Sequence, residues 1–177
     1  MKKDFECFIK ALIEATRRID DPHYFKLEIA ESIPRFRERV YSYELYHQLR
    51  SVLGNDFRYK LDGEVDKRLH PVIIGNKIPD IIVHVPGEME RNLAVIEVKS
   101  VEGAQRHNMK ELRQDLEKLR FFINEGQYYR GIMLIYGDGT QDIPKTILCE
   151  VTRFSKGLKN RILLAWHGGC GWDLEII

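Results

Sequence analysis

The chain has 177 residues, 44% of them hydrophobic, which is enough for one well-filled core and too few for two domains of ordinary size. We therefore predict a single domain over residues 1–177. Its 28 Lys and Arg residues stand against 27 Asp and Glu, a formal net charge of +1, so overall charge does not indicate a polyanionic partner. Only a local basic patch would do so.

The cysteine and charge patterns indicate a soluble protein of a reducing compartment. Cys7, Cys149 and Cys170 lie far apart and lack the CxxC spacing of a zinc or redox site. The first 13 residues are too charged for a signal peptide, and no apolar run approaches the roughly 18 residues of a membrane span. We expect a cytoplasmic location and no membrane partner.

The N-terminal third of the sequence is predicted to be helical. Apolar residues recur at helical spacing over residues 3–19, and the run Asp20-Asp21-Pro22 ends that pattern. A short second helix is predicted over residues 23–33. A long helix is predicted over residues 36–53, closed by Gly54 just beyond its end.

The rest of the sequence alternates between strand and helix signals. Short β-rich runs bounded by Gly and Pro predict strands over residues 57–64, 78–85 and 93–99. An apolar stripe at intervals of four, three and four predicts a helix over residues 105–124, with Leu112, Leu116, Leu119 and Ile123. Further strands are predicted over residues 131–136, 146–151 and 161–167. The sequence thus predicts an α/β domain whose mixed central sheet is flanked by helices, with helical additions at the N-terminus and β additions at the C-terminus.

Three charged residues stand at the ends of two predicted strands. Residues two apart on a strand point to the same face, so Glu97 and Lys99 can serve one site. The short connection before residue 93 predicts antiparallel neighbours, which brings Asp80 close to Glu97. Carboxylates are ligands that hard divalent cations prefer, and such cations activate water in phosphodiester hydrolysis. The alternative is that Lys99 is only the structural partner of a buried carboxylate.

The pair Pro79-Asp80 followed by Glu97-Val98-Lys99 resembles the motif of the PD-(D/E)xK nuclease superfamily, which includes restriction endonucleases and Holliday-junction resolvases. The predicted order over residues 36–137 also resembles its αβββαβ core. The resemblance implies a Mg²⁺- or Mn²⁺-dependent deoxyribonuclease of defence or repair, with DNA as its partner and a homodimer left open. It implies that Asp80, Glu97 and the Val98 carbonyl bind the metal, while Lys99 assists the attacking water.

The resemblance also suggests additional site residues. Members of the superfamily often carry another acidic residue on the helix before the first core strand, where Glu44 stands as a catalytic and metal-binding candidate and Glu64 is its rival. The alternative for Glu44 is an exposed helix glutamate. A Gln or Lys on the following helix assists some members, and the candidates are Gln105, Gln114 and Lys118.

A DNA-binding surface is predicted on the helix over residues 105–124. Arg106, Lys110 and Arg113 have the spacing that places side chains on one helix face, where they would contact phosphates. Ordinary surface solvation is the alternative. Two alternatives to a nuclease remain open. One is a catalytically silent nucleic-acid-binding or protein-interaction module on the same fold. The other is an unrelated α/β domain in which Asp80, Glu97 and Lys99 do not cluster and Lys99 only neutralises one of the carboxylates.

Overall fold

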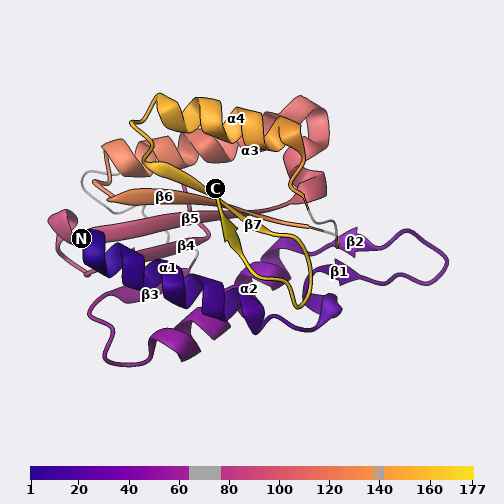
Figure 1. Cartoon of the computed structure of the whole chain (residues 1–177), viewed down its shortest axis with the longest axis horizontal. Helices are drawn as coiled ribbons and strands as arrows, with labels where there is room; N and C mark the ends of the chain where they lie inside the picture. Colours follow the sequence, from indigo (N-terminus) through magenta and orange to yellow (C-terminus); the bar gives the residue numbers. More distant parts are fainter. Residues whose placement is uncertain (64–76, 138, 140–141) are drawn as a thin grey trace.

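The computed structural model describes residues 1–63, 77–137, 139 and 142–177, and its centre is a mixed six-stranded sheet (Figure 1). The strands follow the order β3-β4-β5-β6-β7-β8 across the sheet. The pairs β3/β4, β4/β5 and β7/β8 are antiparallel, whereas β5/β6 and β6/β7 are parallel. Their bounds are β3 (Lys60–Gly63), β4 (Ile81–His84), β5 (Asn92–Ser100), β6 (Arg130–Tyr136), β7 (Ile162–His167) and β8 (Glu175–Ile176).

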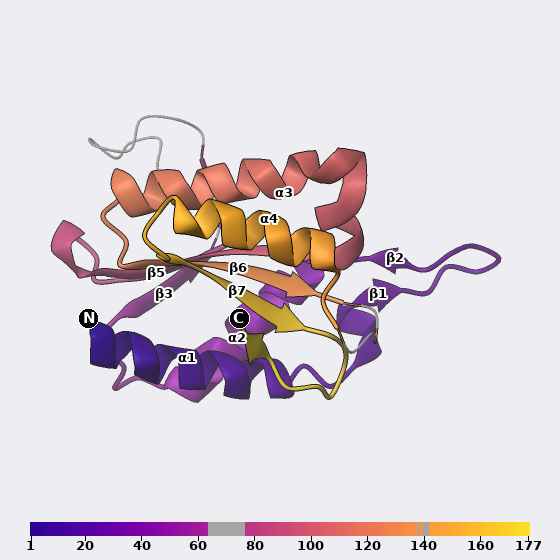
Figure 2. The ribbon, with the colours of Figure 1, turned by 45° about the horizontal axis from the view of Figure 1, so that its top comes forward.

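Helices cover both faces of the sheet (Figures 1 and 2). One layer contains α1 (Lys2–Arg17) and α2 (Glu38–Leu53), and the other contains α3 (Val101–Asn124) and α4 (Lys145–Lys156). The α/β class with a mixed sheet flanked by helices is therefore confirmed. No helix in the described part of the chain is both long and apolar enough to cross a membrane.

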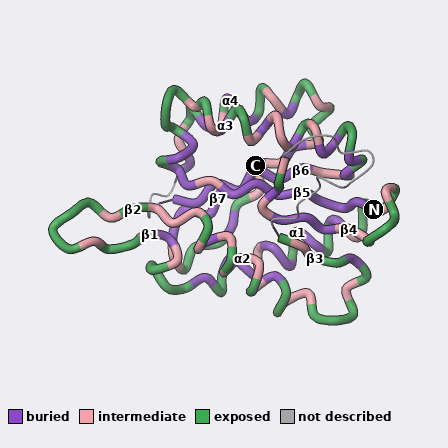
Figure 3. Tube along the Cα trace, turned by 180° about the vertical axis from the view of Figure 1, so that it is seen from behind, coloured by how far each residue is buried: buried purple, intermediate pink, exposed green. Residues whose placement is uncertain are grey.

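Side-chain alternation along β5 divides the interior into two apolar cores. Ala94, Ile96 and Val98 pack with α1 and α2, whereas Val95 packs with α3 and α4. Because alternate residues of a strand point to opposite faces, Glu97 and Lys99 lie on the α3 side with Val95. The strands are mostly buried, as Figure 3 shows, so the backbone of Glu97 and Lys99 lies in a mostly apolar part of the sheet.

Among the described residues, the predicted order of helix, three strands, helix and strand is confirmed in the series α2, β3, β4, β5, α3 and β6. The connection between β4 and β5 contains only the short 3-10 helix η2 (Met89–Arg91). Gly54 ends α2 with φ 65° and ψ −170°, a backbone conformation that only glycine adopts readily. The sequence predicted both the short β4–β5 connection and the end of α2 at Gly54.

The helix predicted over residues 23–33 is wrong. This segment contains the single 3-10 turn η1 (Pro22–Tyr24), followed by a β-hairpin of β1 (Lys26–Leu27) and β2 (Arg35–Phe36). The loop between the two strands projects from the body of the molecule (Figures 1 and 2). The physical reason is pairing of the chain with itself, which a local helical pattern does not reveal.

The strand predicted over residues 146–151 is also wrong, because this segment lies in helix α4. The β-branched residues there suggested a strand. Ile147 and Val151 lie one helical turn apart, however, and both are buried against the sheet. Packing of that helical stripe outweighs the local β preference. The C-terminal addition is therefore a helix followed by β7 and β8.

Helix α3 is interrupted where the sequence predicted continuity. Arg106 has extended backbone angles, and His107, Asn108 and Met109 are left-handed, with φ of 48°, 55° and 61°. The break falls between Arg106 and Lys110, so the continuous helical face expected for Arg106, Lys110 and Arg113 is not formed, while their contact with DNA stays a prediction. Arg106 pairs with Glu102, and Arg113 pairs with Glu150.

Candidate functional site

A cavity of about 540 Å³ lies beside the C-terminal half of β5. Strand β4 begins at Ile81, opposite Ile96, so within the described residues the ladder between β4 and β5 stops one residue before Glu97. Side chains from α2 and α3 enclose the opening. The described residues that line it include four carboxylates, Glu38, Asp80, Glu97 and Asp115, and three cationic groups, Arg39, Lys99 and Lys118.

Asp80 and Glu97 converge at the base of this cavity. Continuing the antiparallel register by one residue places them side by side. The Val98 N–H donates a hydrogen bond to Asp80 Oδ2 at 2.7 Å. Burial raises the pKa of Asp80, while burial and then the charge of Asp80 raise the pKa of Glu97 well above its usual range. Both carboxylates are therefore costly to ionise unless a cation is near.

Glu97 has one engaged oxygen and one unpartnered oxygen. Its side chain is only 2% exposed, and Lys118 Nζ donates to Oε2 at 2.5 Å. Oε1 is buried and has no hydrogen-bond partner among the described residues. An unpaired buried carboxylate oxygen is unusual, because it loses its hydration without compensation.

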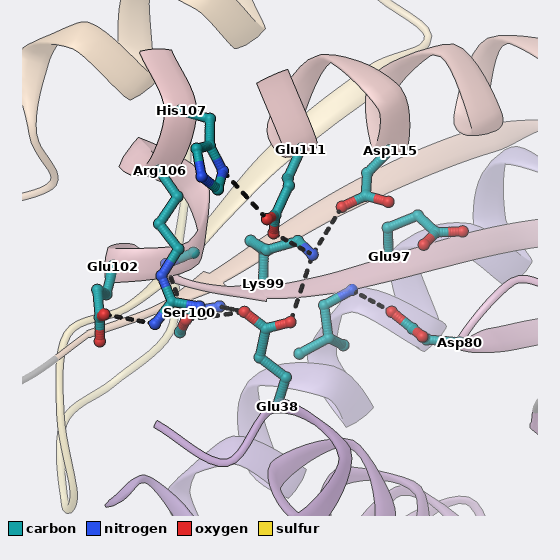
Figure 4. A network of polar contacts seen from close by, with 12 residues as sticks. Glu38, Asp80, Glu97, Lys99, Ser100, Glu102, Arg106, His107, Glu111 and Asp115 are labelled. Atoms are coloured by element: carbon teal, nitrogen blue, oxygen red, sulfur yellow. Dashed lines mark hydrogen bonds and ion pairs between the residues drawn. The ribbon is translucent and has the colours of Figure 1, made fainter. Parts of the chain in front are cut away.

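Lys99 is surrounded by carboxylates from two helices (Figure 4). Its Nζ lies 3.1 Å from Asp115 Oδ2, 3.3 Å from Glu38 Oε2 and 3.8 Å from Glu111 Oε2. Burial alone would lower the pKa of Lys99, but the negative charges of Asp115 and Glu38 outweigh it and raise the pKa. Within the described chain, the ion pairs of Lys99 thus involve neither Asp80 nor Glu97.

On helix α2, Glu38 rather than the predicted Glu44 is the glutamate that lines the cavity. From the first turn of α2, its Oε1 accepts from Ser100 N at 3.1 Å and from Ser100 Oγ at 2.8 Å. Glu44 instead accepts from Gln48 Nε2 at 2.6 Å and does not line the cavity. Acidic residues are common in the first turn of any helix, so Glu38 carried no distinct functional signal. Glu64 lies outside the described residues.

Among the accessory candidates, Lys118 lines the cavity, whereas Gln105 and Gln114 are exposed and do not. Arg106, Lys110 and Arg113 do not line it either. Asp115 was missed. A signal existed, because Asp115 follows Leu112 by three residues and precedes Leu119 by four, which places it on the sheet-facing side of the helix.

The donor groups fit a divalent cation in chemistry, although in the described residues no three His, Cys, Asp or Glu side chains are grouped to hold a metal. Two carboxylates meet, and one of their oxygens lacks a donor. The Val98 N–H is directed to Asp80, and in a strand the N–H and C=O of one residue point to the same side. The Val98 carbonyl is therefore directed to the open side as well, completing a set of two carboxylates and one carbonyl.

Comparison of the chain with protein-family models, curated proteins and solved structures gives no match. Function is therefore inferred from the cavity and its residues.

Proposed function

We propose that this chain is a divalent-metal-dependent nuclease that hydrolyses DNA phosphodiester bonds on a PD-(D/E)xK-like core. The observation that carries the proposal is the meeting of Asp80, Glu97 and Lys99 in one cavity, on one face of the sheet. The element order from α2 to β6 supports the same assignment. A role in defence or repair belongs to the proposal through the resemblance alone.

Asp80, Glu97 and the Val98 carbonyl would hold Mg²⁺ or Mn²⁺, since all three offer oxygen donors. When bound, the ion supplies a Lewis acid and lowers the pKa of a coordinated water. Charge balance supports this choice. The described lining contains one more carboxylate than cationic groups, so a divalent ion would leave a net positive charge to receive a phosphodiester.

Lys99 acts in this proposal as a fixed positive charge. Glu38 and Asp115 hold its ammonium from opposite helices, which limits its movement and favours the charged form. A charged ammonium cannot accept a proton, so Lys99 is not the general base. It can orient the attacking water by donating a hydrogen bond and stabilise the negative charge that develops on the phosphate oxygens.

A catalytically silent DNA-binding module is the second candidate. The observation that favours it is Lys118, whose ammonium already neutralises Glu97, together with the lack of a three-side-chain metal group in the described residues. Such a module would retain DNA without forming metal-dependent products. The dispersed arrangement required by an unrelated domain is not found, since the three residues share one cavity.

The test is cleavage of plasmid, linear and branched DNA with Mg²⁺ or Mn²⁺, comparing the wild type with Asp80→Ala and Lys99→Ala. We expect both variants to lose cleavage while circular dichroism reports an intact fold. Lys156→Ala is the matched control, because Lys156 is an exposed lysine on α4. Undiminished cleavage by either site variant contradicts the proposal, and DNA retention without products in the wild type supports the silent module.

A further inference from the structure

Lys118 is placed where an external cation would be expected. Its ammonium contacts Glu97 Oε2 at 2.5 Å, inside a site whose two carboxylates both have raised pKa values. A carboxylate as buried as Glu97 requires a compensating positive charge, and among the described residues its ion-pair partner is Lys118. A metal that binds both Asp80 and Glu97 must therefore share Glu97 with this ammonium or replace it.

Asp115 offers Lys118 a second carboxylate in close reach. Lys118 Nζ lies 3.4 Å from Asp115 Oδ1, and the two residues are three positions apart on α3. The other oxygen of Asp115, Oδ2, holds Lys99. Each oxygen of Asp115 thus faces a different lysine, and Lys118 can leave Glu97 without becoming an unpaired buried charge.

We propose that Lys118 is an internal cation that competes with the metal for Glu97 and transfers fully to Asp115 when the metal binds. This inference rests on the proposed function, because it takes Asp80 and Glu97 as the metal-binding carboxylates. Lys118 stabilises the metal-free site by neutralising the charge of Glu97. For the same reason, Lys118 lowers the affinity of the site for metal. Asp115 is a positioning residue that receives Lys118 and keeps Lys99 in place.

Competition differs from simple repulsion in how the effects of two substitutions combine. If Lys118 only repels the metal through space, removal of Asp115 weakens metal binding equally with or without Lys118. If Lys118 must move to Asp115, the loss of Asp115 matters most when Lys118 is present. A double-mutant cycle on metal affinity therefore separates the two mechanisms.

The experiment titrates Mn²⁺ into metal-free protein by isothermal calorimetry, without DNA. We expect Lys118→Gln to lower the Kd for Mn²⁺ about tenfold and Asp115→Asn to raise it about tenfold, the scale of groups that surround metal ligands. In the Lys118→Gln background, Asp115→Asn should change the Kd by less than about threefold. Lys110→Gln, which changes an exposed lysine of the same helix, should leave the Kd unchanged. Lys118→Met serves as a second variant if Lys118→Gln does not fold.

The possible results distinguish this inference from the proposed nuclease function. If Mn²⁺ binds but the effects of Lys118→Gln and Asp115→Asn on its Kd are additive, competition is overturned and the nuclease function is not. The same holds if Lys118→Gln leaves the Kd unchanged or raises it. Mn²⁺ binding with the expected coupling but no DNA cleavage supports competition and overturns the nuclease function. No Mn²⁺ binding to the wild type or to either Lys118 variant overturns both.

Discussion

The Glu38 carboxylate lies 3.3 Å from the Lys99 ammonium, although 61 positions separate the two residues in the chain. Its other oxygen accepts hydrogen bonds from the backbone and hydroxyl of Ser100. The same Ser100 hydroxyl accepts from Gly103 N at 3.0 Å and caps the start of α3. One side chain from α2 thus fixes the end of β5, the orientation of Lys99 and the beginning of α3.

Substitution of Glu38 should impair the site more than substitution of Glu44. Glu38→Gln retains an acceptor for Ser100 but removes one of the two carboxylate charges that hold Lys99, so we expect kcat/KM for DNA cleavage to fall by about tenfold or more. Glu44→Gln should leave kcat/KM unchanged, because Glu44 does not line the cavity. Steady-state cleavage of one DNA substrate measures both variants. Equal losses in the two variants would contradict the role assigned to Glu38.

Asp80→Asn should remove cleavage and stabilise the metal-free protein. Burial raises the pKa of Asp80, so its ionised form opposes folding; this opposition grows as pH rises from the unfolded value of 3.8 to the higher folded pKa and is complete above the folded pKa. The Asn carbonyl can still accept from Val98 N. We expect the free energy of unfolding at neutral pH to rise by about 1 kcal/mol, a common gain when a functional charge is neutralised.

Urea denaturation of metal-free protein measures this gain, with Asp56→Asn as an exposed control that should change stability little. A destabilised Asp80→Asn variant would mean that the Asp80 charge supports the fold rather than the site.

His167 should make the protein less stable in acid. Burial lowers the pKa of His167 from 6.5 to about 4, and its Nδ1 lies 2.7 Å from the buried Tyr41 hydroxyl. The folded state therefore holds a neutral imidazole, and the unfolded state binds the proton first. The neutral His167 therefore contributes folding stability that is fully present above pH 6.5 and is lost as pH falls toward 4. The loss in the free energy of unfolding is about 3 kcal/mol at most.

Guanidinium denaturation between pH 7.5 and 4.5 tests this dependence. His167→Gln should flatten the curve over that range, whereas His47→Gln, on the exposed side of α2, should retain the wild-type slope. If both variants keep the same slope, His167 is not the source of the acid sensitivity.

Gly54→Ala should destabilise the fold through the backbone alone. Gly54 has φ 65° and ψ −170°, a region that residues with a Cβ avoid, yet an added Cβ would meet no described atom within 4 Å. We expect a loss of about 1–3 kcal/mol in the free energy of unfolding. Thermal melting compares it with Gly157→Ala at the end of α4, where φ is −63° and a side chain fits ordinary helical geometry. A loss no larger than in the control would exclude backbone strain.

The errors of sequence prediction follow from long-range packing. The segments at residues 23–33 and 146–151 carried local preferences for helix and strand, but pairing of β1 with β2 and burial of one face of α4 determined the result. The break in α3 includes His107 and Asn108, residue types that tolerate a left-handed backbone, but the apolar spacing from Leu112 onward dominated the sequence prediction. Glu38 and Asp115 were not predicted for the site, because their roles depend on contacts between α2, β5 and α3.

The sequence by itself determined the class of fold and the core of the candidate site. Strand alternation put Glu97 and Lys99 on one face, and the short connection between β4 and β5 made Asp80 a neighbour of Glu97, since both rules act over a few residues. Only the tertiary structure decided the partner of each charge: Lys118 for Glu97, and Glu38 and Asp115 for Lys99. Those pairings depend on how two helices pack on opposite faces of the sheet, a relationship set by the whole core and not by local spacing.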